Sequence, residues 1–437
     1  MYCKCCSKYI KLKVNVYLIS YCATRSEDTV LKSFKNQSYI KNALIMFLFF
    51  ASWGIWWSFF QIWLSSKAHG IGLSNTQIGI IFSINSFTTL LFNLIYGLIQ
   101  DKLGVSRILL LICSFISIFT GPFFVYFYAP FLEEHFYIVG FIGSLFISSA
   151  FLAAMGLYEA VVEKFSRTYN FNYGESRAWG SLGYAIISLF SGYLFLTDAS
   201  LIFWCGSFLG LLLFLIIILY KPNIEKVSST HLYSHYSTFP NIKTASVFEQ
   251  SKFWILVIVI LFTCPFYLIY EQQLFPSFYI HISNLSHING EHVYSILNSV
   301  QVFIEVLTMI VAPRIITKLG IKQTIILSFI IMNIRVGGSL FAHDIVSISI
   351  VKLIHGIQIP LFVLPIFQYI TLHFNTKFSA TIYLLGYLMV VKIGQIIFST
   401  PIGSFQDNTN FNLTFLLIFV VILITTIFAK FTLRTDT

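Results

Sequence analysis

The chain has 437 residues, of which 57% are hydrophobic, 18% aromatic and only 10% charged. An average soluble domain is about 25% charged, so this composition excludes an ordinary soluble protein and predicts one that crosses a membrane several times. The net charge of +10 does not indicate a nucleic-acid partner, because Lys and Arg cluster at the ends of apolar segments and not on a polar domain.

The first 33 residues are polar and mixed, without the compact apolar core and small-residue site of a cleavable signal peptide. Cys3, Cys5 and Cys6 could form a metal or lipidation site, but no His or second Cys pair completes a zinc set. We therefore expect residues 1–33 to be a disordered cytoplasmic extension, or a wrongly assigned start of the chain.

Twelve apolar segments have about the 20 residues needed to cross a bilayer. Six precede a polar stretch at 221–252 and six follow it, near 42–64, 76–99, 107–129, 136–162, 177–197, 199–220, 253–280, 292–313, 322–342, 345–373, 378–402 and 411–431. The pattern predicts an all-α membrane protein with twelve transmembrane helices in two six-helix bundles, residues 34–220 and 253–437, joined by a cytoplasmic linker.

Positive charge is concentrated in one set of loops and in the linker. Its carriers there are Lys102, Arg107, Lys164, Arg167, Lys221, Lys226, Lys243, Lys252, Arg314, Lys318, Lys322 and Lys377. The opposite loops carry Lys67 but are otherwise acidic. By the positive-inside rule, we expect both termini and the linker on the cytoplasmic side of a cell membrane.

A repeated loop indicates two related halves. Gly97-Leu-Ile-Gln-Asp-Lys-Leu-Gly-Val-Ser-Arg107 follows the second apolar segment, and Pro313-Arg-Ile-Ile-Thr-Lys-Leu-Gly-Ile-Lys322 follows the eighth. Either loop alone could be an ordinary basic turn. Together they resemble the duplicated halves of major facilitator transporters, whose substrate site lies where the halves meet.

Charged or titratable side chains interrupt the apolar segments. They are Glu159, Arg177, Glu271, Glu305, Arg335, Lys352, His355 and Lys392. A charge at the centre of a membrane helix costs roughly 2.5–3.5 kcal/mol, so such residues generally pair with one another and line a polar pathway. This feature predicts a transporter.

Glu159 and Arg177 are equally distant from a polar turn centred near Thr168. In a helical hairpin they would lie at one depth, roughly 13 Å in at 1.5 Å per residue, and should pair or share a ligand. A carboxylate beside a guanidinium suits a polyhydroxylated ligand, because one accepts and the other donates hydrogen bonds. A purely structural ion pair is the alternative. Ser181 and Tyr184 share the helix face of Arg177.

Aromatic rings could stack on the C–H face of a sugar. Trp179 follows Arg177 closely in sequence but points elsewhere by helical angle. Trp53, Trp56 and Trp57 could face a ligand or form an interfacial belt, and both interpretations stay open.

The second half of the chain repeats the paired arrangement. Arg335 and Lys352 flank the turn at 341–344 at matching depth. Lys352, His355 and Gln358 share one helical stripe. Glu271 is the carboxylate that we expect to face this cationic cluster.

From about Phe34 onward, the chain resembles the oligosaccharide:proton symporters, the family of lactose and sucrose permeases. The resemblance is carried by Ser52-Trp-Gly-Ile-Trp-Trp-Ser58, Ile62-Trp-Leu64, Glu163-Lys164, Tyr173-Gly-Glu-Ser-Arg-Ala-Trp-Gly-Ser-Leu-Gly-Tyr-Ala185, Glu271-Gln-Gln-Leu-Phe-Pro276, Val351-Lys-Leu-Ile-His355 and Ser379-Ala-Thr-Ile-Tyr383. The segments around Arg177 and the Trp-Trp-Ser triplet look more like sucrose permeases than lactose permeases.

The resemblance implies roles for these residues. It implies that sugar is bound by Glu159, Arg177, Ser181 and Tyr184. It also implies that Glu271 pairs with Lys352. A proton-coupling cluster would further include Glu305, Arg335 and His355.

Three departures from the family bear on coupling. Gln358 stands where the family has the glutamate that gains and loses the transported proton, and an amide cannot titrate. Leu268 replaces an aspartate of lactose permeases, and Glu305 lies about one turn beyond their glutamate. Two interpretations stay open: an uncoupled exchanger or uniporter, or a symporter in which Glu305, near Lys392, carries the proton.

Together these features predict a permease that moves a disaccharide, sucrose or a related sugar, nominally with a proton as the co-transported ion. We expect a functional monomer without a cofactor, a metal or catalytic residues, because no nucleophile arrangement appears at suitable depth. The alternatives are a nucleoside or organic-anion carrier, and a sugar sensor that has lost transport. A sensor would be expected to carry a sizeable soluble signalling domain.

Overall fold

The computed structural model describes residues 36–103, 106–169, 171, 173–220, 250–285, 289–374 and 382–435. These residues fold into helices, and no strand occurs among them. The predicted extension at 1–33 and nearly all of the predicted linker at 221–252 lie outside the described residues.

The first half contains α2 (Gln37–Ser65), α3 (Asn75–Leu103), α4 (Ile108–Ile118), α5 (Thr120–Pro122), η1 (Phe123–Tyr128), α6 (Ala129–Leu132), α7 (Phe136–Ile147), η2 (Ser148–Leu152), α8 (Ala154–Tyr169), α9 (Tyr173–Thr197) and α10 (Ser200–Leu219). The second half contains α13 (Ser251–Ile269), η4 (Tyr270–Leu274), α14 (Phe275–Leu285), α15 (Gly290–Leu319), α16 (Ile321–Leu340), α17 (Ile345–His373), η6 (Leu384–Leu388), α19 (Met389–Asn408) and α20 (Phe411–Thr432). The η elements are short π-helical segments.

Eleven helical runs within the described residues are long and apolar enough to cross a membrane, and a bent pair makes up to twelve. The pair is α4 with residues Thr120–Leu132, which meet at 47°. Pro122 ends α5 just after the bend, and its missing backbone N–H favours a kink there. The continuous span predicted near 107–129 is therefore corrected to a broken one. The predicted fold class is confirmed.

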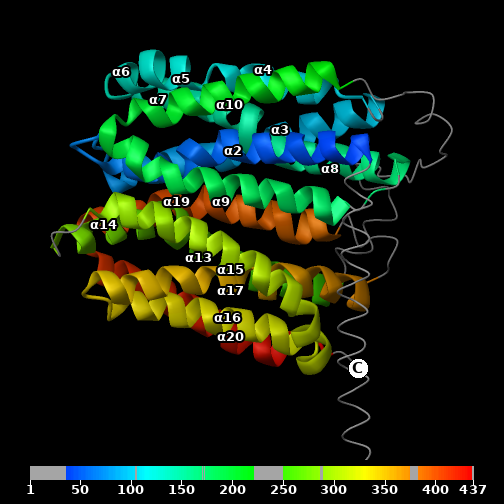
Figure 1. Ribbon diagram of the computed structural model, residues 1–437. Coiled ribbons are helices and arrows are strands. Elements are labelled where there is room, and N and C mark those ends of the chain that lie inside the picture. The colour runs from blue at the N-terminus through cyan, green and yellow to red at the C-terminus, as the bar shows by residue number, and fades with distance from the viewer. Residues whose placement is uncertain are drawn as a thin grey trace, which may run out of the picture.

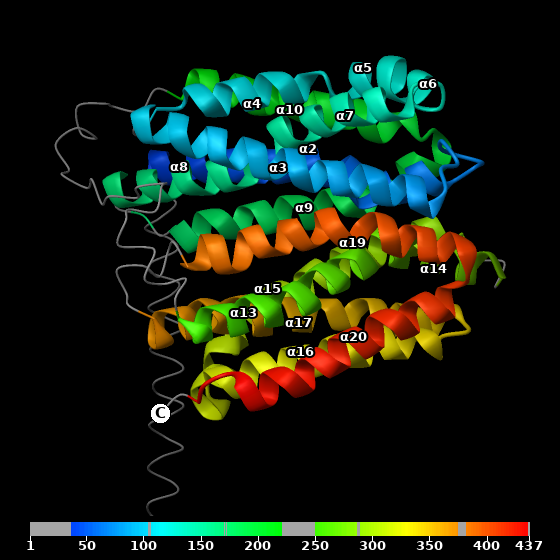
Figure 2. The same ribbon diagram turned by 180° about the vertical axis from the view of Figure 1, so that it is seen from behind.

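The helices run side by side, and the two halves of the chain lie next to each other (Figure 1). Helices of residues 37–219 are blue to green, and those of residues 251–432 are yellow-green to red. Seen from behind, α3 and α19 lie together where the halves meet (Figure 2). We call the end at which α10 finishes and α13 begins the linker end, and the other end the distal end.

Trp56 lies inside the aromatic core of the first half. Its side chain is fully buried, with the ring centroids of Phe124 and Phe151 5.2 and 5.1 Å away. Trp53 and Trp57 are partly buried against the same core. The interfacial-belt interpretation of these tryptophans is therefore wrong, since belt residues would face the lipid headgroups.

Hydrogen bonds join the two halves at the distal end. The Asp407 carboxylate, close to the end of α19, accepts from the backbone N–H groups of Asn75 and Thr76 at 3.0 and 2.7 Å. It also accepts from both of their side chains, at 2.9 and 2.6 Å. Asn75 and Thr76 begin α3, so a side chain of the second half caps a helix of the first. A further bridge, 2.5 Å long, runs from Gln61 Nε2 to Ser277 Oγ.

Small and hydroxylated residues form the contact between α9 and α15. Ser188 Oγ lies 2.7 Å from Ser299 Oγ, which also donates to the Ala185 carbonyl at 2.6 Å. A Cβ on Gly192 would lie 2.6 Å from Ser295 Oγ, so these helices approach closely because Gly192 has no side chain. The halves are thus held together from the distal end toward the middle of the helices.

Candidate functional site

The Glu159–Arg177 pair links α8 to α9. Arg177 Nε donates to Glu159 Oε1 at 2.5 Å, and both side chains keep 30% of their surface exposed. Arg177 Nη1 also donates to Ser181 Oγ at 3.2 Å. The guanidinium lies over the ring of Phe50 on α2, 4.3 Å from its centroid. The predicted pairing is confirmed, and it leaves polar atoms accessible to a ligand.

The predicted reason for this pairing is wrong. Helix α8 continues to Tyr169, and α9 begins only at Tyr173, so no turn is centred at Thr168. Glu159 therefore lies ten residues from the end of α8 and Arg177 four residues from the start of α9, about 15 and 6 Å in at 1.5 Å per residue. The long arginine side chain spans the difference in depth.

Tyr184 lies further along α9 and packs against α2. Its ring is edge-on to Trp53 at 6.5 Å, and a Cβ on Gly54 would lie 2.6 Å from it. Gly54 therefore makes room for the ring. Trp179 points elsewhere, as predicted, because its Nε1 donates to the Tyr39 hydroxyl at 3.0 Å.

The second half holds a compact charge cluster. Glu271 in η4 forms an ion pair with the fully buried Arg335 on α16, and His355 Nε2 lies 3.9 Å from Glu271 Oε1. Arg335 donates to the Val351 carbonyl and to the Tyr267 hydroxyl, each at 2.9 Å. The Tyr267 hydroxyl lies 2.9 Å from His355 Nδ1. These contacts confirm the prediction that Glu271 faces a cluster of basic residues on α16 and α17.

Lys352 is not the ion-pair partner of Glu271 that the resemblance implied. The carboxylate forms its ion pair with Arg335 instead, and no ion pair joins it to Lys352 among the described residues. Lys352 is fully buried, and no hydrogen-bond partner of its Nζ occurs within the described part of the chain. Its Nζ lies over the Tyr294 ring, 4.0 Å from the centroid.

Gln358 and Glu305 have different surroundings. Gln358 is fully buried, and neither atom of its amide finds a hydrogen-bond partner among the described residues. Glu305 on α15 is half-buried, and the charged side chain that interacts with it electrostatically is Arg177. The expected neighbour Lys392 donates instead to Gln395 at 3.1 Å. No ion pair joins Lys392 to Glu305 among the described residues.

A model of the LacY proton/sugar symporter family matches residues 31–437. A sucrose permease of Escherichia coli is 36% identical over 399 residues, which cover 91% of this chain and 94% of the permease. The chain belongs to the LacY family of sugar transporters.

Other relatives agree with this membership. A raffinose permease of Escherichia coli is 31% identical over 92% of this chain and 94% of its own. A lactose permease of Klebsiella oxytoca is 29% identical over 86% of this chain and 90% of its own. The crystal structure of the nucleoside transporter NupG has a TM-score of 0.76 at 14% identity, covering 90% of this chain and 98% of that one. That likeness supports the fold alone.

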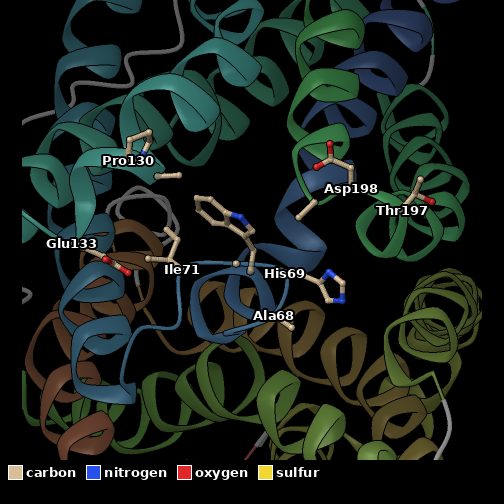
Figure 3. A pocket seen from close by; sticks show the side chains of 11 residues that line it. Ala68, His69, Ile71, Pro130, Glu133, Thr197 and Asp198 are labelled. Carbon is tan, nitrogen blue, oxygen red and sulfur yellow. The ribbon is translucent and has the colours of Figure 1, made fainter.

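A surface hollow at the distal end of this LacY-family protein is separate from the charged pairs. It has a volume of about 670 Å³ and is lined in part by His69, Glu133 and Asp198 (Figure 3). All of its lining residues come from the first half of the chain, and none of the sugar-binding or coupling residues predicted above is among them.

Three aromatic contacts in this sugar transporter were not predicted. Phe50 lies under Arg177, Tyr267 joins Arg335 to His355, and Tyr294 lies under Lys352. The chain has 47 Phe and 24 Tyr, so no signal in the sequence distinguishes these three from the rest.

Proposed function

We propose that this LacY-family protein carries a disaccharide, sucrose or a closely related sugar, across the cell membrane by alternating access. The observation that carries the proposal is the Glu159–Arg177–Ser181 group, in which the Glu159 and Arg177 side chains remain 30% exposed beside the ring of Phe50. A sugar hydroxyl can donate to the carboxylate and accept from the guanidinium. The similarity to a sucrose permease supports the choice of sugar.

The proposal includes the membrane topology. The linker end would be cytoplasmic, with both termini on that side, and residues 34–220 and 253–437 would act as two rocking bundles. The present structure, joined at the distal end, would then be closed toward the outside. One chain would suffice for transport, and no cofactor would be needed beyond a co-transported proton.

Proton symport is the nominal mode for a member of this family, and uncoupled exchange is the second candidate. Gln358 favours exchange, because its buried amide has no titratable group. Symport requires another group that takes up and releases the proton.

The test is sugar flux in proteoliposomes with sucrose, lactose and maltose. Counterflow measures binding and alternating access, whereas uptake under an imposed proton gradient measures coupling. We expect sucrose counterflow in the wild type and its strong reduction in Glu159→Gln. An absence of flux for every sugar would contradict the proposed function.

A further inference from the structure

Lys352 is surrounded by groups that do not neutralise its charge. Its Nζ lies 4.0 Å from the centroid of the Tyr294 ring and 5.8 Å from that of Phe275. The side chain is fully buried, and no acceptor bonds Nζ among the described residues. Glu271, the carboxylate of this cluster, is already bound by Arg335.

The charges of the cluster sum to zero without Lys352. Glu271 contributes one negative charge and Arg335 one positive charge, and they form an ion pair. His355 is neutral here, because Arg335 Nη1 lies 3.2 Å from its Nδ1 and a guanidinium can only donate. An ammonium at Lys352 would therefore add an uncompensated charge, which is costly in an apolar interior. A neutral amine would not.

Position 358 of the cluster holds glutamine, where the resemblance to the family implies an acid. Gln358 shares the helical stripe of Lys352 and His355 but cannot release a proton. Of the titratable groups in the cluster, Lys352 is the one whose charge can change without breaking either the Glu271–Arg335 ion pair or the hydrogen bond from Arg335 to His355.

We propose that Lys352 carries the transported proton in place of an acid at position 358. The lone pair of the Nζ amine would take a proton from water when the site faces one side of the membrane. The resulting ammonium would return that proton to water on the other side, so that one proton moves with each sugar. This inference rests on the proposed sugar transport and deepens it.

Two features of the cluster make such a cycle possible: its exposure to water and the ring of Tyr294. The side chains of Glu271 and His355 keep 12% and 10% of their surface exposed, so they give water access to the cluster. The Tyr294 ring stabilises the ammonium through a cation–π contact, which keeps both protonation states of Lys352 accessible.

Tyr294 also connects protonation to the orientation of the halves. Its ring is edge-on to Phe59 of the first half, with centroids 6.0 Å apart at an interplanar angle of 88°. When the halves part at the distal end, this support of the ring is lost. The ammonium at Lys352 is then stabilised differently in the two orientations, which is what coupling requires.

Lys352→Met tests the inference, because methionine keeps an apolar stem but cannot be protonated. Sucrose counterflow and accumulation under a proton gradient are measured in the same proteoliposomes, together with proton uptake during downhill sugar flow. We expect accumulation in the wild type, and an accumulation ratio of one without proton uptake in the variant, whose counterflow stays measurable. The double variant Lys352→Met with Gln358→Glu should regain accumulation, because it has an acid again.

Lys392→Met is the matched control, since it removes a lysine from another membrane-spanning helix, where it is bonded to Gln395. It should accumulate sugar as the wild type does. Equal accumulation by Lys352→Met and the wild type would overturn the inference, as would wild-type counterflow without accumulation. An absence of all flux in the wild type would instead overturn the proposed function on which the inference depends.

Discussion

Replacing Asp407 with Ala removes the carboxylate that caps α3 from the other half of the protein. Four hydrogen bonds to Asn75 and Thr76 are lost together. Losing a helix N-cap costs about 0.5–2 kcal/mol, and we take about 1 kcal/mol because Asp407 is exposed. This bond group exists only while the distal end is closed. At about 1.4 kcal/mol per factor of ten, the ratio of distally closed to distally open molecules should fall about fivefold.

The population shift is measurable by double electron–electron resonance between spin labels at positions 69 and 409, which are exposed in different halves at the distal end. Asp407→Ala should increase the fraction of long distances. Asp198→Ala is the control, because Asp198 accepts a hydrogen bond from the Ser200 N–H within one half. Identical distance distributions for the wild type and Asp407→Ala, or an equal shift in the control, would refute this reasoning.

Three further substitutions test the two charged groups. Glu159→Gln weakens the charge-assisted hydrogen bond that we propose between the carboxylate and a sugar hydroxyl. Such a bond is worth about 1.5–3 kcal/mol, less here because Glu159 is partly exposed, so the half-saturating sugar concentration in counterflow should rise roughly tenfold. Gly54→Ala should displace the Tyr184 ring, which would lie 2.6 Å from the new Cβ. The half-saturating sugar concentration should then rise by up to about tenfold. Arg335→Met leaves Glu271, whose side chain is only 12% exposed, without its ion-pair partner, a loss of up to about 3–5 kcal/mol, and should lower the unfolding temperature in detergent.

The chain offers matched controls for the first two substitutions. Glu163→Gln removes a carboxylate of α8 that pairs with Arg167 at the exposed end of the helix, and it should leave half-saturation unchanged. Gly156→Ala adds a Cβ that meets no atom within 4 Å beyond its own chain neighbours and helix backbone, and should be tolerated. If either control weakened counterflow as much as its partner, the effect could not be assigned to the sugar group. An unchanged unfolding temperature in Arg335→Met would show that Glu271 finds another partner.

The sequence predicted well those features that depend on local pattern. Apolar runs located the spans with ends no more than seven residues from those observed, because crossing a bilayer demands a long stretch without charge. The bend after Ile118 was not predicted, since the sequence remains apolar on both sides of it. Pairing of Glu159 with Arg177 followed from the cost of an isolated charge, but the end of α8 at Tyr169 and the start of α9 at Tyr173 could not be located from composition.

Partner choice within the charge cluster was harder to predict. Arg335 and Lys352 are both cations at similar depth, and only the fold decides which of them reaches Glu271. Ring contacts such as Tyr294 beneath Lys352 depend on helix rotation, which a pattern of apolar residues does not specify when aromatic residues are this abundant.

The serine-lined contact between α9 and α15 can come apart without leaving a polar group unsatisfied. Ser188 Oγ also donates to the Ala185 carbonyl of its own helix, and Ser295 Oγ to the His292 carbonyl. Ser299 Oγ has the carbonyl of Ser295 at 3.4 Å. When the helices separate, each hydroxyl can therefore replace a hydrogen bond across the interface with one to a carbonyl of its own helix. Separation of the halves then costs little desolvation, and the seam can open and close many times during a transport cycle.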